Sequence, residues 1–98
     1  MTINKTQEGS VLTVALEGRL DTTTSPELET ELKSSLDGIT ELIMDLEKLD
    51  YISSAGLRVL LSAHKAMLPK EGMKVIHVND IVQEVFEVTG FDSILDVE

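Results

Sequence analysis

The chain has 98 residues, a length that suits one small domain and leaves little room for a deep catalytic cavity. Its 18 acidic and 8 basic residues give a formal net charge of −10, which disfavours binding to nucleic acid or to anionic lipid. The absence of cysteine excludes disulfides, thiolate nucleophiles and cysteine-based zinc sites.

Hydropathy narrows the class of protein further. No stretch approaches the roughly 18 apolar residues that a spanning helix needs, and no apolar run typical of a signal peptide begins the chain. Aromatic residues make up only 3% of the chain, too few for the stacking surfaces that bind single-stranded nucleic acid. We therefore expect a cytoplasmic protein without membrane insertion and without a nucleic-acid partner.

The beginning of the chain predicts a β-hairpin. Residues 2–6 are a short strand candidate, and residues 10–17 alternate, with Leu12, Val14 and Leu16 on one face. A turn that contains a glycine joins the two segments.

The next segment predicts a helix. Thr24 and Glu27 have the spacing of a capping box, and Pro26 suits the first turn, where a missing N–H costs nothing. Gly38 is expected to end the helix in the left-handed conformation. The apolar stripe of this helix consists of leucines four residues apart: Leu28, Leu32 and Leu36.

The middle of the chain predicts a strand followed by a helix. Residues 39–46 are almost continuously apolar, which is typical of a central strand covered on both faces. Residues 57–68 carry leucines and a histidine at spacings of three and four, as an amphipathic helix does. Between the two segments, Ser53 and Ser54 stand just ahead of the first helical turn.

The last third predicts one more strand and one more helix. Residues 73–78 alternate, which gives His77 a packed position in the strand. Asp80 and Gln83 resemble a cap, Gly90 ends the helix, and residues 91–97 form a short strand or an extended tail. The order ββαβαβα(β) predicts an α/β fold whose sheet is parallel in the middle, with a hairpin at one side.

The two serines admit two interpretations. A helix start presents unpaired N–H groups and roughly half a positive charge, so it suits an anion. Ser54 is therefore either a structural cap or a place where a phosphate is added and removed. Ala55 and Gly56 are small neighbours, and Gly56 costs roughly 1 kcal/mol relative to alanine within a helix, which indicates a close approach there.

Enzymatic interpretations have less support. A nucleophilic serine would need a G-x-S-x-G elbow and a nearby histidine, whereas His64 lies about 15 Å along the same helix from Ser54. Asp21, Asp45 and Asp50 could together bind Mg²⁺, but their spacing is unspecific, and Asp21 serves equally well as a turn residue. We expect no catalytic residue, no metal, no cofactor and no nucleotide-binding loop.

The stretch from Tyr51 to Leu61, YISSAGLRVLL, resembles a STAS domain, and more narrowly the single-domain anti-sigma factor antagonists of bacteria. Gly18-Arg19-Leu20-Asp21 is similar to the G-x-[IL]-D of that family, residues 43–46 to its buried strand, and Gly90-Phe91 to its G-[LF]. The resemblance covers the whole chain, so it implies a single STAS domain over residues 1–98, with helices packed on a small mixed sheet.

The resemblance also implies a mechanism. In that family the loop usually reads D-S-[ST]-G-L, and the serine after the aspartate is phosphorylated by a partner that is both serine kinase and anti-sigma factor, a GHKL-type ATPase. Ser54 takes the position of the phosphorylated serine, and Ser53, the alternative acceptor, stands where the family has aspartate. The unphosphorylated protein would bind the anti-sigma factor and release a sigma factor, and phosphorylation would reverse this.

We expect a protein that is not an enzyme and that is a monomer or a weak dimer. One alternative is a STAS subunit that binds the ATPase of a lipid-transport system without phosphorylation. A small-ligand-sensing module and a purely structural role for both serines are further alternatives. The residues expected to bind the partner flank the helix start: Asp21, Ser53, Ser54, Ala55, Gly56 and Arg58.

Overall fold

The elements follow one another in the order that the sequence predicts. The computed structural model describes residues 1–98. The C-terminal segment forms both a 3₁₀ turn and a short strand. In chain order the elements are β1 (Thr2–Glu8), β2 (Val11–Leu20), α1 (Ser25–Ser35), β3 (Glu41–Ile52), α2 (Ser54–Met67), β4 (Gly72–Ile76), α3 (Asp80–Thr89), the 3₁₀ turn (Phe91–Ser93) and β5 (Asp96–Val97).

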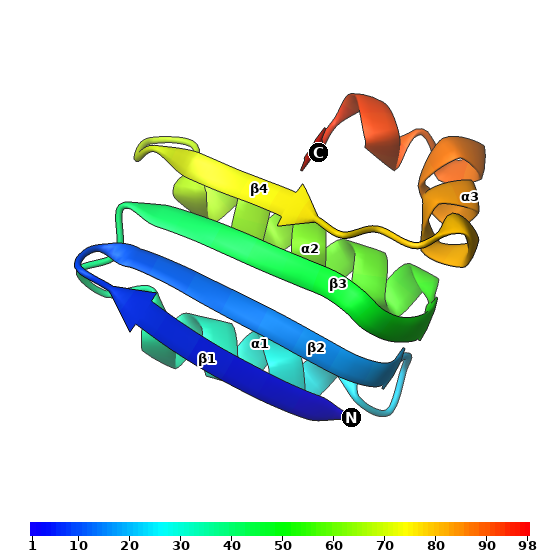
Figure 1. Ribbon diagram of the computed structural model, residues 1–98, viewed down its shortest axis with the longest axis horizontal. Helices are drawn as coiled ribbons and strands as arrows, with labels where there is room; N and C mark the ends of the chain where they lie inside the picture. The colour runs from blue at the N-terminus through cyan, green and yellow to red at the C-terminus, as the bar shows by residue number, and fades with distance from the viewer.

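The five strands form one sheet in the order β1-β2-β3-β4-β5. β1 and β2 are antiparallel, and β2 to β5 are parallel, so the expected hairpin and parallel centre are confirmed. The crossovers through α1 and α2 advance in the same direction across the sheet. Since such crossovers are right-handed, both helices belong on the same face, and Figure 1 shows them together behind the sheet.

The opposite face of the sheet carries no helix, so the expectation that β3 is covered on both faces is wrong. Leu42, Met44 and Leu46 are fully buried, whereas the intervening Ile43 and Asp45 are only half-buried. The alternation shows that the apolar run belongs to a sheet with one open face.

The covered face of the sheet and the inner faces of the helices share one core of 22 buried hydrophobic residues. Leu28 and Leu32 of α1 belong to it, as the leucine stripe predicts, and Leu36 packs against its margin. Phe86 anchors α3 in the same core with no exposed surface. No helix is long and apolar enough to cross a membrane.

The start of α1 differs from the predicted capping box. Thr24 makes no side-chain hydrogen bond to the helix, because its ψ of −21° is already helical and does not turn the hydroxyl over the free N–H groups. Its hydroxyl instead donates to the carbonyl of Arg19 at 2.8 Å and accepts from the amide of Asp21 at 2.9 Å. Pro26 lies in the first turn, as predicted.

The end of α1 is only partly as predicted. The helix ends at Ser35, and its C-cap residue is Leu36 in a right-handed conformation. Gly38 has the expected left-handed conformation, with φ +78°, but it belongs to the turn that follows.

The start of α3 is capped by Asn79, not by Asp80. The Asn79 side chain accepts from the amide of Val82 at 2.9 Å and donates to the carbonyl of Leu49 at 2.6 Å. The cap therefore also joins α3 to β3. Gly90, with φ +80°, ends the helix as predicted.

His77 is exposed, so the packed position that alternation predicts for it is wrong. β4 ends at Ile76, and His77 has φ +57°, which breaks the strand alternation. Its Nδ1 lies 3.0 Å from Asp45 Oδ1 and 3.5 Å from Glu47 Oε2 on the neighbouring strand.

Candidate functional site

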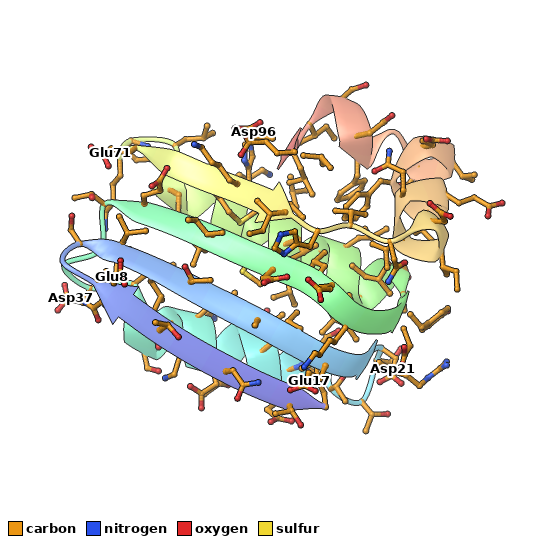
Figure 2. All side chains as sticks on the ribbon, in the orientation of Figure 1. Glu8, Glu17, Asp21, Asp37, Glu71 and Asp96 are labelled. Carbon is orange, nitrogen blue, oxygen red and sulfur yellow. The ribbon has the colours of Figure 1, made fainter.

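The first turn of α2 lies beside the end of β2. The amide of Ser53 donates to the carbonyl of Leu20 at 2.9 Å, and the strand register pairs Arg19 with Tyr51. The carboxyl ends of parallel neighbours meet at one edge of the sheet, on the right in Figure 1. Figure 2 shows Asp21 at this edge, just beyond β2. Asp21 thus lies near the serine loop, as the sequence predicts.

The two serines have different structural roles. Ser53 is the N-cap of α2, with extended φ −97° and ψ 175°, and its Oγ accepts from the amide of Gly56 at 3.4 Å. Ser54 is the first residue of the helix, is exposed, and makes no side-chain hydrogen bond within the chain. The sequence left the cap and the free hydroxyl as alternative roles for Ser54. In the structure Ser53 is the cap, and Ser54 has the free hydroxyl.

Gly56 is buried, and the close approach that it permits is internal. A Cβ at this position would lie 2.7 Å from Leu20 Cγ and 2.9 Å from Ile52 Cγ1. Gly56 therefore lets the start of α2 pack directly on the ends of β2 and β3. Gly56 thus supports the surface around Ser54 from beneath.

Asp21 is the centre of the loop between β2 and α1. Its Oδ1 accepts from the amides of Thr23 at 3.0 Å and Thr24 at 3.1 Å, and it lies 3.3 Å from the Thr24 hydroxyl. The hydrogen bond from the Thr24 amide, more than any other group, holds the pKa of Asp21 below its ordinary value of 3.8. Partial desolvation opposes this shift, whereas the other hydrogen bonds and the Arg19 guanidinium support it. The ionised carboxylate therefore orders the loop beside Ser53.

Arg19 and Tyr51 form a stacked pair next to this loop. The guanidinium carbon of Arg19 lies 4.4 Å from the centre of the Tyr51 ring, and its Nε lies 3.9 Å from Asp21 Oδ2. Tyr51 is 37% exposed, so the pair offers an accessible aromatic and cationic surface.

No motif in the sequence indicates this pair. Its geometry depends on two register shifts between β2 and β3, between Ala15 and Glu17 and between Gly18 and Arg19. Such bulges leave no clear pattern in one sequence, so the partner of Arg19 on β3 could not be found.

A shallow hollow separates the first turns of α1 and α2. Arg58 and Ala55 line one side of it, and Arg58 forms no ion pair with any acidic residue of the chain. The exposed guanidinium is therefore free to bind an anionic group. The hollow is lined by Thr22, Ser25, Pro26, Glu29, Ala55, Arg58 and Val59.

The structure does not gather Asp21, Asp45 and Asp50 into a metal site. Asp45 instead lies with Glu47 and His77, whose ligand atoms are all within 4.8 Å of one another. Glu47 and His77 are exposed, and the His77 ring lies within hydrogen-bond distance of Asp45 on the surface of the sheet.

Comparisons with known proteins agree over the whole chain. A model of the STAS domain family matches residues 2–98. BtrV of Bordetella bronchiseptica, a candidate anti-sigma factor antagonist, is 40% identical over 89 residues, which cover 89% of this chain and 77% of BtrV. The anti-sigma-B factor antagonist of Staphylococcus aureus is 29% identical over 99 residues, which cover 99% of this chain and 92% of that protein.

Solved structures show the same fold. An anti-sigma factor antagonist from Mycobacterium paratuberculosis superposes with a TM-score of 0.88 at 23% identity, covering 98% of this chain and 83% of that one. Unphosphorylated SpoIIAA gives a TM-score of 0.84 at 16% identity, covering 99% of this chain and 88% of that one. Phosphorylated SpoIIAA from Bacillus gives 0.76 at 15% identity, covering 99% and 91%.

The family match and the fold point to the same assignment. The matched residues include all five strands and all three helices. A relative that is 40% identical over 89% of the chain excludes a similarity limited to the serine loop. The chain belongs to the STAS domain family, and its named relatives are anti-sigma factor antagonists.

Proposed function

We propose that this protein is an anti-sigma factor antagonist that works by partner switching and is controlled by phosphorylation of Ser54. The observation that carries the proposal is the exposed hydroxyl of Ser54, which has no hydrogen bond within the chain, at the first position of α2. Ser53, by contrast, is committed as the cap of the helix. The names of the relatives support the class of function.

In this mechanism the unphosphorylated protein binds an anti-sigma factor and thereby frees a sigma factor. The anti-sigma factor is also a serine kinase of the GHKL type. It transfers the γ-phosphoryl group of ATP to Ser54: the bond from phosphorus to Ser54 Oγ forms, the bond to the β-phosphate oxygen breaks, and ADP leaves. The hydroxyl proton passes to a base of the kinase. Catalysis therefore belongs to the partner, and we assign this chain no catalytic residue or cofactor.

The helix start can accept the phosphate without a change of fold. Phosphorylation adds roughly −1.5 to −2 charges. The unpaired N–H groups and positive end of the α2 dipole favour an anion at this position. The cost falls on the complex, where a neutral hydroxyl becomes a bulky dianion next to the Asp21 loop. A coupling of about 1–3 kcal/mol would lower the affinity for the partner about 5–150-fold.

We propose that the protein acts in the cytoplasm. The direct test is incubation of the purified protein with the cognate kinase and ATP, followed by intact-mass spectrometry and mapping of the modified residue. We expect one phosphate, on Ser54. Ser54→Ala should abolish the modification, whereas the matched variant Ser53→Ala should retain it. Ser54→Asp should weaken the binding of this protein to the kinase. Phosphate on Ser53 alone, or tight binding by Ser54→Asp, would refute the mechanism.

One observation favours a second candidate function. Ser53 stands where the phosphorylated members have an aspartate, so the acceptor hydroxyl has an uncharged neighbour. A STAS subunit that binds the ATPase of a lipid-transport system needs the same surface without phosphorylation. Affinity capture with the wild-type protein distinguishes the two, because it would recover a transporter ATPase in place of a sigma-regulating kinase.

A further inference from the structure

The chain contains only two arginines, and both lie beside the start of α2; the other six basic residues are lysines. Arg19 is occupied, because it stacks on Tyr51 and approaches Asp21. Arg58 is exposed and forms no ion pair. Arg58 is therefore an unpaired arginine beside the start of α2, in a protein with a net charge of −10.

The position of Arg58 relative to Ser54 suggests a role for this side chain. Arg58 is four residues after Ser54 in α2, so the two side chains lie on one face, about 6 Å apart along the axis. Helical side chains lean toward the N-terminus, so the Arg58 side chain extends toward the first turn of α2, where it lines the hollow beside Ala55. An anion followed by a cation four residues later is also the favourable order for a helix.

Competing acceptors for Arg58 are weak. Asp21 Oδ1 already accepts from two amides of its own loop, those of Thr23 and Thr24. Glu29 lines the far side of the hollow but pairs with Lys33 at 3.2 Å. A phosphate on Ser54 would place a strong anion one helical turn before Arg58, whose planar guanidinium suits phosphate oxygens.

We propose that Arg58 forms an intramolecular ion pair with the phosphoryl group on Ser54. Phosphorylation would then make the Arg58 guanidinium unavailable to the partner. Before modification the free guanidinium binds an acidic group of the anti-sigma factor, in the way that arginine anchors dominate many interfaces. After modification it is bound to the phosphate. The switch then removes an attractive contact as well as adding a repulsive charge. This inference rests on the proposed function of Ser54.

The test uses phosphoserine installed at position 54 by genetic encoding, so it does not depend on the kinase. Phosphorus-31 NMR titration gives the second pKa of the phosphate, which is about 6 for free phosphoserine. Arg58→Gln should raise this pKa by about half a pH unit relative to phosphorylated wild type, and Arg58→Lys should raise it by less. Lys65→Gln is the control, because this exposed cation lies about 16 Å along the helix from Ser54. Equal pKa values in wild type and Arg58→Gln would overturn the proposal.

The affinity for the anti-sigma factor gives a second, independent measurement. Arg58→Gln should weaken binding of the unphosphorylated protein about tenfold, and phosphorylation should then reduce the affinity by a smaller factor than in wild type. If phosphorylation has the same effect with and without Arg58, the proposed loss of the Arg58 contact is refuted while the switch at Ser54 stands. If Ser54 is never phosphorylated by the kinase, the proposed function fails, although the titration still reports on the contact with Arg58.

Discussion

A Cβ atom on Gly56 would lie 2.7 Å from Cγ of Leu20, closer than a real side chain tolerates. Leu20 is the last residue of β2 and has no exposed surface. Ile52, the last residue of β3, lies 2.9 Å from the same point. Because Gly56 has no side chain, the start of α2 packs directly on the ends of β2 and β3. The position of Ser54 depends on this packing.

Gly56→Ala should therefore destabilise the protein even though alanine is the better helix former. Overpacking costs about 1–3 kcal/mol, and the helix propensity of alanine returns roughly 1 kcal/mol. We expect a net loss of about 1 kcal/mol in the free energy of unfolding, measured by urea denaturation. Ser54→Ala, an exposed change two residues away, is the control and should leave stability unchanged. A stabilised Gly56→Ala would show that Leu20 and Ile52 can move aside.

Ser53→Ala should lower stability without preventing phosphorylation of Ser54. The variant removes the side-chain acceptor of the Gly56 amide, and loss of a serine cap costs about 1 kcal/mol. Because this hydrogen bond is long, at 3.4 Å, we expect a loss of stability in the lower part of the usual range for serine caps. Urea denaturation measures the stability, and mass spectrometry after the kinase reaction measures the acceptor. Ser53→Asp, which retains a capping oxygen, should restore the stability.

Local patterns predicted the features that depend on a few neighbouring residues. The helix end at Gly90 and the place of Pro26 follow from backbone chemistry that is visible in the sequence. The hairpin and the parallel centre were predictable from the order of the elements, but the exact register and the open face of the sheet were not. The open face of the sheet at Ile43 follows from the order of the strands, and the pairing of Arg19 with Tyr51 follows from two bulges. Neither leaves a trace in one sequence.

The candidate site was predictable in outline, since the small residues after Ser54 and the strand-to-helix transition are visible in the sequence. What could not be predicted is which serine caps the helix, because that depends on a single ψ angle at Ser53. The internal role of Gly56 was equally hidden, because the side chain that it admits, Leu20, is distant in the sequence.

Asp21→Asn should destabilise the protein at neutral pH and much less in acid. The pKa of Asp21 is lowered in the folded protein, so its carboxylate stabilises the fold above the ordinary value of 3.8 and loses this effect as the pH falls through the folded pKa. The stability difference between wild type and variant should thus shrink as the pH falls through 3.8 and below, in urea denaturation at a series of pH values. A difference that is constant with pH would show that the Thr23 and Thr24 donors bind the amide equally well.

Asn79 should be among the polar residues on which stability depends most. Its side chain caps α3 through the amide of Val82 and also satisfies the carbonyl of Leu49 on β3. Asn79→Ala removes both hydrogen bonds and should cost about 2 kcal/mol, roughly 1 for the cap and 1 for the unpaired carbonyl. Asn79→Asp separates the two contributions, because a carboxylate still caps the helix but cannot donate to Leu49 when ionised. We expect an intermediate loss for Asn79→Asp in urea denaturation. If Asn79→Asp were as stable as wild type, the bond to Leu49 would contribute nothing, and α3 would be held on β3 by Phe86 and its apolar neighbours alone.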